Sequence, residues 1–306
     1  MSWVKQTRAI LPVVAFLAVL SGSCNNGNTP KTVAVTTETI PNAAQPLSVY
    51  EQYLNKLDTG HAVNASLAAH KFEELFSTTT QQINDSAYRL FERYYTRLAD
   101  GLSDQHKFDT IETISSNAIS LDDPGKYLAE LAKPFAELKA NGFRLSETEG
   151  MVIVIEDRSF IQPHFYKFVS PSMKEFLQQV KKESDEGFQE DAALLISPVQ
   201  LCERTVWWEK FANTYPAFAM KDYATGTQKE YTTVLLKGMD NSPIADYDTK
   251  HIDSAYKEAY DHVLRKYPES ATAHILKPYY DALLANDSAK ASKLLMEYRN
   301  QNIILW

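Results

Sequence analysis

Apolar residues recur at spacings of three and four through most of this chain, and this periodicity limits the fold more than any other feature of the sequence. The clearest stripe lies in 84–99 and consists of Ala87, Leu90, Phe91, Tyr94 and Leu98. Side chains at this period share one face of an α-helix, and that face must pack against a core. The same pattern predicts helices over 46–58, 126–140, 171–183 and 198–213. We therefore expect a mainly α-helical body built from several amphipathic helices.

Short motifs predict where these helices begin and end. Ser170-Pro171 and Ser197-Pro198 each combine an N-cap serine with a proline at the first helical position, where its missing N–H breaks no hydrogen bond. Asn84-Asp85-Ser86 offers a cap for the helix with the clearest stripe. Asn141-Gly142 should end the helix over 126–140, and we expect Pro134 to kink it.

Only one region of the chain has a clear sheet pattern. The run Met151 to Ile155, in which every residue after the methionine is β-branched, follows the short segment 143–145, and a turn containing Gly150 lies between them. An isolated hairpin is barely stable in water, so this one must pack on helices. The expected fold is a multi-helix domain with one small antiparallel hairpin insert at about 143–156.

Charge and composition exclude several classes of protein. Asp and Glu number 39 against 31 Lys and Arg, and the formal net charge of −8 argues against nucleic acid as a partner. Ten glycines and two cysteines argue against Gly-rich phosphate loops, a disulfide scaffold and a Cys-rich zinc site. The hydrophobic fraction of 44% is ordinary for a globular protein.

The N-terminus has the form of an export signal. Two basic residues, Lys5 and Arg8, precede the apolar run 9–20, which is followed by small residues and Cys24. This run is too short to cross a bilayer. The small residues that end in Cys24 resemble the lipobox of bacterial lipoproteins, a family in which the cysteine is joined to a diacylglycerol and the chain is cut just before it. Cleavage by ordinary signal peptidase, which would give a secreted or periplasmic soluble protein, is the alternative.

The lipoprotein resemblance implies a membrane partner and a place in the cell envelope. Residues 1–23 would be the signal peptide, and 24–45, rich in Asn, Thr, Ala and Pro, would form a disordered tether to the helical body 46–306. A flexible segment of this length reaches about 25 Å. Since Asn25 rather than Asp follows the cysteine, lipoprotein sorting would favour the outer membrane in a host with two membranes.

Two similar segments near the C-terminus lie 34 residues apart. SAYKEAYDHVLRKY begins at Ser254 and SAKASKLLMEYRNQ begins at Ser288, and we expect a helix at about 270–285 between them. This period is typical of tetratricopeptide repeats. The segment 252–301 resembles one and a half such repeats, which implies a peptide-binding surface and a division of the body near 240–250. An ordinary helical hairpin is the alternative interpretation.

The sequence contains none of the common catalytic motifs. The nucleophile elbow, the H-E-x-x-H zinc motif, the phosphate-binding loop and the dinucleotide fingerprint are all missing. Metal ligands occur only in pairs one helical turn apart, Glu258 with His262 and His70 with Glu74, each without a recognisable third ligand. The acidic loop around Asp246 lacks the spacing of a calcium-binding EF-hand. We therefore predict no cofactor and no metal centre.

Carboxylates and tryptophans provide the candidate ligand-binding residues. Glu149 and Glu156 lie beside the predicted hairpin, and paired carboxylates at a defined separation can hydrolyse glycosidic bonds. Trp207 and Trp208 point in different directions on one helix, so one should be buried while the other can stack on a sugar or a partner.

Together these features predict an extracytoplasmic lipoprotein, more consistent with a non-enzymatic protein- or peptide-binding module than with an enzyme. The alternative is an extracytoplasmic hydrolase or glycan-binding protein that uses the carboxylates near 147–157 and Trp207 or Trp208.

Overall fold

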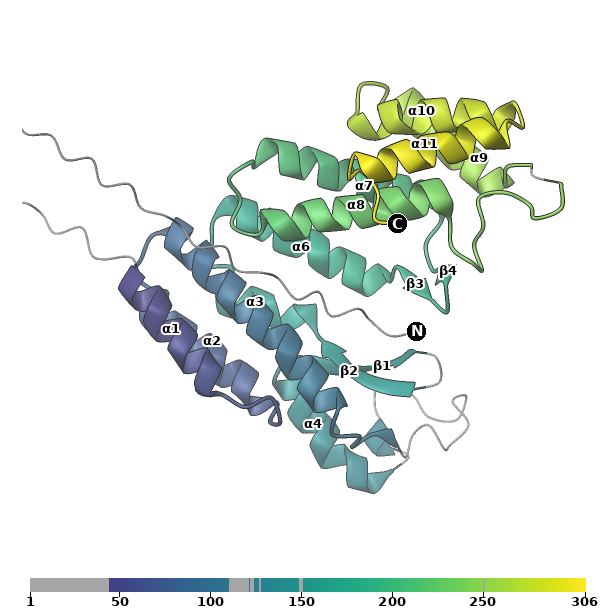
Figure 1. The fold of residues 1–306 in the computed structure, drawn as a ribbon. Helices are drawn as coiled ribbons and strands as arrows, with labels where there is room; N and C mark the ends of the chain where they lie inside the picture. The colour runs from purple at the N-terminus through teal and green to yellow at the C-terminus, as the bar shows by residue number, and fades with distance from the viewer. Residues whose placement is uncertain (1–43, 110–120, 122–123, 127, 149–150, 250) are drawn as a thin grey trace, which may run out of the picture. The chain divides into compact units, whose positions relative to one another are not determined.

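Helices dominate the part of the chain that the computed structural model describes, which is residues 44–109, 121, 124–126, 128–148, 151–249 and 251–306 (Figure 1). These residues belong to the compact unit Asn42–Trp306. They contain eleven α-helices and two small antiparallel sheets. The prediction of a mainly α fold with a β-hairpin insert is confirmed.

The first group of elements surrounds the long helix α3. The elements are α1 (Ala44–Lys56), α2 (Val63–Phe76), α3 (Gln81–Ser103), the 3-10 turns η2 (Pro124–Lys126) and η3 (Ala129–Leu131), α4 (Ala132–Ala140), β1 (Phe143–Thr148), β2 (Met151–Glu156), η4 (Arg158–Phe160) and α5 (Ile161–Phe165). The hairpin pairs Phe143 with Glu156 and Thr148 with Met151, and β2 packs on α3. An aromatic core fills the space between α1, α2, α3 and α5, with Phe72 and Phe165 rings 4.9 Å apart.

The second group of elements is arranged around helix α7. The elements are α6 (Pro171–Glu186), β3 (Gln189–Glu190), β4 (Ala193–Leu194), α7 (Pro198–Thr214), α8 (Lys221–Lys237), α9 (Ser254–Lys266), α10 (Ala271–Leu284) and α11 (Ser288–Asn300). Helix α7 packs against α8, α9 and α10, and α10 packs against α9 and α11. Helices α9 and α11 begin at Ser254 and Ser288, as the sequence offset predicts, and α10 occupies the expected place between them.

Local capping motifs position two helices as predicted. The Ser170 hydroxyl accepts a hydrogen bond from the Met173 N–H at the start of α6. Ser197 and Gln200 form a reciprocal capping box at the start of α7. Because these bonds involve only neighbouring residues, the sequence alone determines them.

Helix α3 begins earlier than its predicted cap. Thr80 is its N-cap residue, and Asn84 and Asp85 lie inside the helix, where both are buried. The Asn84 side-chain amide donates to the Phe168 carbonyl at 2.9 Å, and Asp85 accepts hydrogen bonds from the N–H and hydroxyl of Ser170. Partners distant in sequence therefore use the polar side chains that we expected to cap this helix.

Two further details differ from the sequence prediction. Pro134 lies in the first turn of α4, because that helix begins at Ala132, so it removes no helical hydrogen bond. The helix ends at Ala140 with Asn141 as its C-cap residue, as expected, and Gly142 follows with a φ of 88°. The strands β3 and β4 have two residues each, and we did not predict them because so short a segment has no periodic pattern.

Candidate functional site

The two predicted tryptophans have different environments. Trp208 is fully buried, and its ring packs edge-on against Phe176 with centroids 5.7 Å apart. Trp207 is partly buried and stacks on Phe211 with centroids 5.1 Å apart and an interplanar angle of 13°. Trp208 thus offers no face to a ligand, and any stacking on a sugar would fall to Trp207. Cys24 lies outside the described residues.

Glu156, at the end of β2, belongs to a largely buried ion-pair cluster. Its Oε1 accepts a hydrogen bond from the Thr96 hydroxyl at 2.8 Å and lies 3.8 Å from Arg158 Nη2. Arg158 Nη1 also donates to Glu92 Oε1 at 2.6 Å. Burial alone would lower the pKa of Arg158, but the neighbouring carboxylates of Glu92 and Glu156 raise it well above its usual value. Glu149, the second predicted carboxylate, lies outside the described residues.

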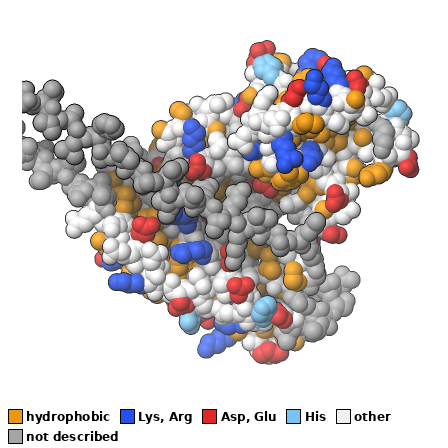
Figure 2. Space-filling view, in the orientation of Figure 1, with side chains coloured by type: hydrophobic (Ala, Val, Ile, Leu, Met, Phe, Trp, Pro, Cys, Tyr) orange, Lys and Arg blue, Asp and Glu red, His pale blue; other side chains and the backbone are white. Residues whose placement is uncertain are grey.

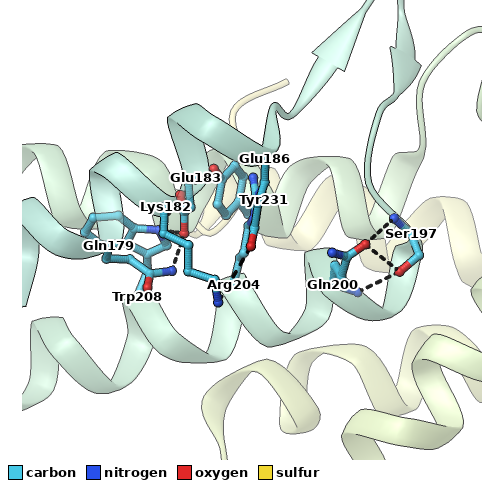
Figure 3. Close-up of polar contacts among 9 residues, drawn as sticks. All are labelled: Gln179, Lys182, Glu183, Glu186, Ser197, Gln200, Arg204, Trp208 and Tyr231. Atoms are coloured by element: carbon cyan, nitrogen blue, oxygen red, sulfur yellow. Dashed lines mark hydrogen bonds and ion pairs between the residues drawn. The ribbon is translucent and has the colours of Figure 1, made fainter. Parts of the chain in front are cut away.

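A second buried carboxylate, Glu183, connects helices α6, α7 and α8 (Figure 3). Its Oε1 accepts hydrogen bonds from Gln179 Nε2 at 2.6 Å and from Trp208 Nε1 at 3.0 Å. Its Oε2 accepts a hydrogen bond from the Tyr231 hydroxyl at 2.8 Å. Trp208, a predicted ligand-binding residue, therefore acts as a hydrogen-bond donor inside the core. We call Gln179, Glu183, Arg204, Trp208 and Tyr231 the Glu183 cluster.

The charge of this cluster is balanced within the protein. Burial raises the pKa of Glu183, and hydrogen bonds from Tyr231 and Gln179 oppose that rise. Arg204 is also buried and donates from Nη2 to Glu186 Oε2 at 2.8 Å, while its Nε and Nη1 have no hydrogen-bond partner among the described residues. Since both Glu183 oxygens already accept protein donors, the cluster holds three helices together and leaves no carboxylate oxygen for a substrate.

An open pocket lies where the N-terminal ends of α7 and α9 meet the loop before α9. Its volume is about 640 Å³, within the usual range for ligand pockets. We call it the α7–α9 pocket. Its apolar lining consists of Leu194, Ile196, Pro198, Pro243, Ala245, Ile252, Ala255 and Tyr256. Its polar lining consists of Asn241, Ser242, Asp246, His251, Asp253 and Ser254.

Backbone hydrogen bonds fix the walls of this pocket. The Asp246 N–H donates to the His251 carbonyl at 2.9 Å, next to a β-bridge between Ala245 and Ile252. Ser242 links two walls, because its hydroxyl accepts the Leu194 N–H at 3.0 Å and its carbonyl accepts the Tyr256 hydroxyl at 3.2 Å. These hydrogen bonds hold the walls of the pocket in place, although most of its lining comes from a loop.

Two aspartates carry the charge of the α7–α9 pocket. Asp246 Oδ1 accepts hydrogen bonds from Thr249 and from the Asp248 N–H, and these bonds lower the pKa of Asp246. Asp253 Oδ1 caps α9 by accepting the N–H groups of Ala255 and Tyr256, at 2.8 and 3.3 Å. The face in Figure 2 mixes acidic and basic side chains, whereas the described residues that line the pocket include no Lys or Arg and one histidine, His251.

In each metal-ligand pair noted in the sequence, one member has another partner. Glu74 accepts a hydrogen bond from Lys71 at 2.6 Å. His262 contacts Glu203, which also accepts hydrogen bonds from Lys266 and Tyr267. Among the described residues, no group of three or more His, Cys, Asp and Glu side chains is arranged to hold a metal ion. The loop around Asp246 instead uses that carboxylate to accept hydrogen bonds from its own residues.

Comparison of the chain with protein-family models, with curated proteins and with solved structures gave no match in any of the three. Within the described ranges, every helix is too short or too polar to cross a membrane.

Sequence reasoning missed most of the α7–α9 pocket. The sequence places Asp246 in an acidic loop, but no sequence pattern predicts that Leu194, Ile196 and Asp253 share a site. They come from separate segments and meet only because α7 packs against α9. The acidic loop was the one feature of the sequence that could have led to this pocket.

Proposed function

We propose that this protein is an extracytoplasmic lipoprotein, anchored through Cys24, that binds a protein or peptide and catalyses no reaction. The export signal and the resemblance of the residues around Cys24 to a lipobox support the anchor. Since α1 begins at Ala44 and so includes the last two residues of the predicted tether, the tether that we propose is 24–43. A flexible chain of that length reaches about 25 Å, which would display the helical body away from the membrane.

The α7–α9 pocket is the observation that carries the binding part of this proposal. It is concave, it combines apolar walls with a few polar groups, and such a composition is typical of ligand sites. Two neighbours of its lining residues, Leu195 and Tyr247, are 55% and 86% exposed. Exposed apolar side chains beside a pocket favour contact with another macromolecule.

The helical arrangement around the pocket supports the same class of ligand. Helices α9 and α11 begin 34 residues apart, the period of tetratricopeptide repeats, and α7 packs against α9 at the pocket. Repeats of this kind commonly present extended binding surfaces. In the two buried clusters, by contrast, Glu156 and Glu183 already interact with protein donors, which favours binding over hydrolysis.

Site-specific photo-cross-linking in intact cells tests the binding role. A photoreactive amino acid would replace Leu195 or Tyr247 beside the pocket, and Leu67 on α2, which is 42% exposed, would be the control position. We expect a discrete cross-linked protein from the first two positions and none from the third. The absence of a product at both pocket positions, or identical products at all three, would contradict the proposal.

The anchor is tested in the same cells with Cys24→Ala. Loss of the thiol prevents attachment of the diacylglycerol, so we expect the protein to move from the membrane fraction to the soluble fraction. Retention of the variant in the membrane fraction would exclude this anchor.

A further inference from the structure

The carboxylates of the α7–α9 pocket are oriented by the backbone but not neutralised by it. In both Asp246 and Asp253 the hydrogen bonds from nearby N–H groups go to Oδ1. The second oxygen, Oδ2, accepts no hydrogen bond from the other described residues in either side chain. The described residues that line the pocket include no Lys or Arg, and His251, whose charge contributes to the lowered pKa of Asp246, is the one basic side chain that faces the two carboxylates.

Helix N-termini often attract anions, but those at this pocket are already capped. Ser197 accepts the Gln200 N–H at the start of α7, and Asp253 accepts the Ala255 N–H at the start of α9. An anionic ligand would therefore meet two carboxylates rather than free N–H groups. The net charge of −8 for the whole chain also attracts cations rather than anions.

The apolar walls add a second requirement for the ligand. Ile196 and Tyr256 are buried at the pocket, and Leu194 and Ile252 are partly buried. These side chains can cover an aliphatic stem, while Asp246 and Asp253 pair with a cationic head. Lysine and arginine combine these two parts, since each carries a charge at the end of a hydrocarbon chain.

We propose that the α7–α9 pocket receives a lysine or arginine side chain from a peptide segment of the partner protein. This inference rests on the proposed binding function and names the chemistry of its ligand. The stem packs against Ile252 and Tyr256, and the cationic head pairs with the Oδ2 atoms of Asp246 and Asp253.

Binding of synthetic peptides to the purified full-length protein in detergent tests this inference. Three fluorescent peptides would be identical except for a central Lys, Met or Glu, and anisotropy would measure their dissociation constants. Asp246→Asn and Asp253→Asn remove the charges, while asparagine still supports a turn or a helix cap. Asp287→Asn is the matched control, because Asp287 accepts the Lys290 N–H at the start of α11, outside the pocket.

We expect the Lys peptide to bind most tightly and each pocket substitution to weaken it by about two- to fivefold, as for exposed ion pairs. The Asp287→Asn variant should bind as the wild type does, and the effect of the pocket substitutions should shrink at high ionic strength. This combination would support a cationic side chain as the occupant.

Four other outcomes would overturn the inference. Equal binding of the Lys, Met and Glu peptides, or binding unchanged by both pocket substitutions, would exclude charge recognition. Failure of every peptide while the pocket cross-links persist would exclude this ligand and leave the proposed function standing. Binding of free spermidine in place of the peptides would assign the pocket to a polyamine. If no cross-linked protein forms at Leu195 or Tyr247, the proposed function itself would be contradicted.

Discussion

Glu183 and Asp253 lie in the same group of helices, but their carboxylates have contrasting surroundings. Glu183 is 8% exposed, and side chains from α6, α7 and α8 donate to its two oxygens. Asp253 is exposed, and its hydrogen bonds come from the backbone at the start of α9 and reach only one oxygen. A carboxylate with both oxygens occupied stabilises packing, whereas one with a free oxygen at a pocket can bind a ligand.

The comparison extends to the basic side chains at the two sites. Arg204, a member of the Glu183 cluster, is buried and pairs with Glu186, so the core there contains a positive charge. Among the described residues, the lining of the α7–α9 pocket contains no Arg or Lys, and its one basic side chain is His251. A buried charge without a counter-charge would destabilise the fold. In an open pocket, by contrast, water hydrates a carboxylate that has no ligand.

The largest expected effect tests whether Glu183 stabilises the packing of α6, α7 and α8. Glu183→Ala leaves the Trp208 N–H, the Tyr231 hydroxyl and the Gln179 amide without their acceptor, beside a buried Arg204. We expect a loss of about 3–5 kcal/mol in the free energy of unfolding, measured with urea. Asp185→Ala, on the exposed side of α6, is the control and should change stability by less than about 0.5 kcal/mol. A similarly small loss for Glu183→Ala would refute the structural role.

The pH dependence of stability should differ in sign between the two regions. Burial raises the pKa of Glu183 above its ordinary value of 4.5, so the folded state holds this proton more tightly than the unfolded state. Hydrogen bonds from Thr249 and Asp248 lower the pKa of Asp246 below its ordinary value of 3.8. The folded state therefore releases this second proton more readily.

These shifts predict opposite trends when each variant is compared with the wild type by urea denaturation across pH. Relative to Glu183→Gln, the wild type should lose stability as pH rises from 4.5 through the folded pKa of Glu183. Relative to Asp246→Asn, it should have its full stability above pH 3.8 and lose it as pH falls through the folded pKa of Asp246. Trends of the same sign in both comparisons would be inconsistent with the assigned environments.

The smallest expected effect distinguishes the contribution of Asp253 as a helix cap from the contribution of its charge. Asp253→Ala removes the N-cap of α9 and should cost about 1 kcal/mol, whereas Asp253→Asn keeps a capping oxygen and should cost only a few tenths. Thermal unfolding of both variants measures the difference. Equal losses in the two variants would mean that the charge, not the cap, is what Asp253 contributes to stability.

Much of the fold was predictable because its determinants are local. The hairpin from Phe143 to Glu156 followed from β-branched residues around a turn, and α6 and α7 followed from the serine-proline pairs at their starts. Asn84 marks the limit of such reasoning. It has the chemistry of a cap, but a carbonyl 84 residues away uses its amide, and no local pattern contains that partner.

The sequence by itself determined the positions of most helices and the 34-residue offset between α9 and α11. Each depends on residues close together in the chain, where spacing alone specifies the interaction. Only the tertiary structure decided that Trp208 donates to a buried Glu183 and that Leu194, Asp246 and Asp253 line one pocket. These outcomes depend on how α6, α7, α8 and α9 pack, because burial and neighbouring charge are set by segments far apart in sequence.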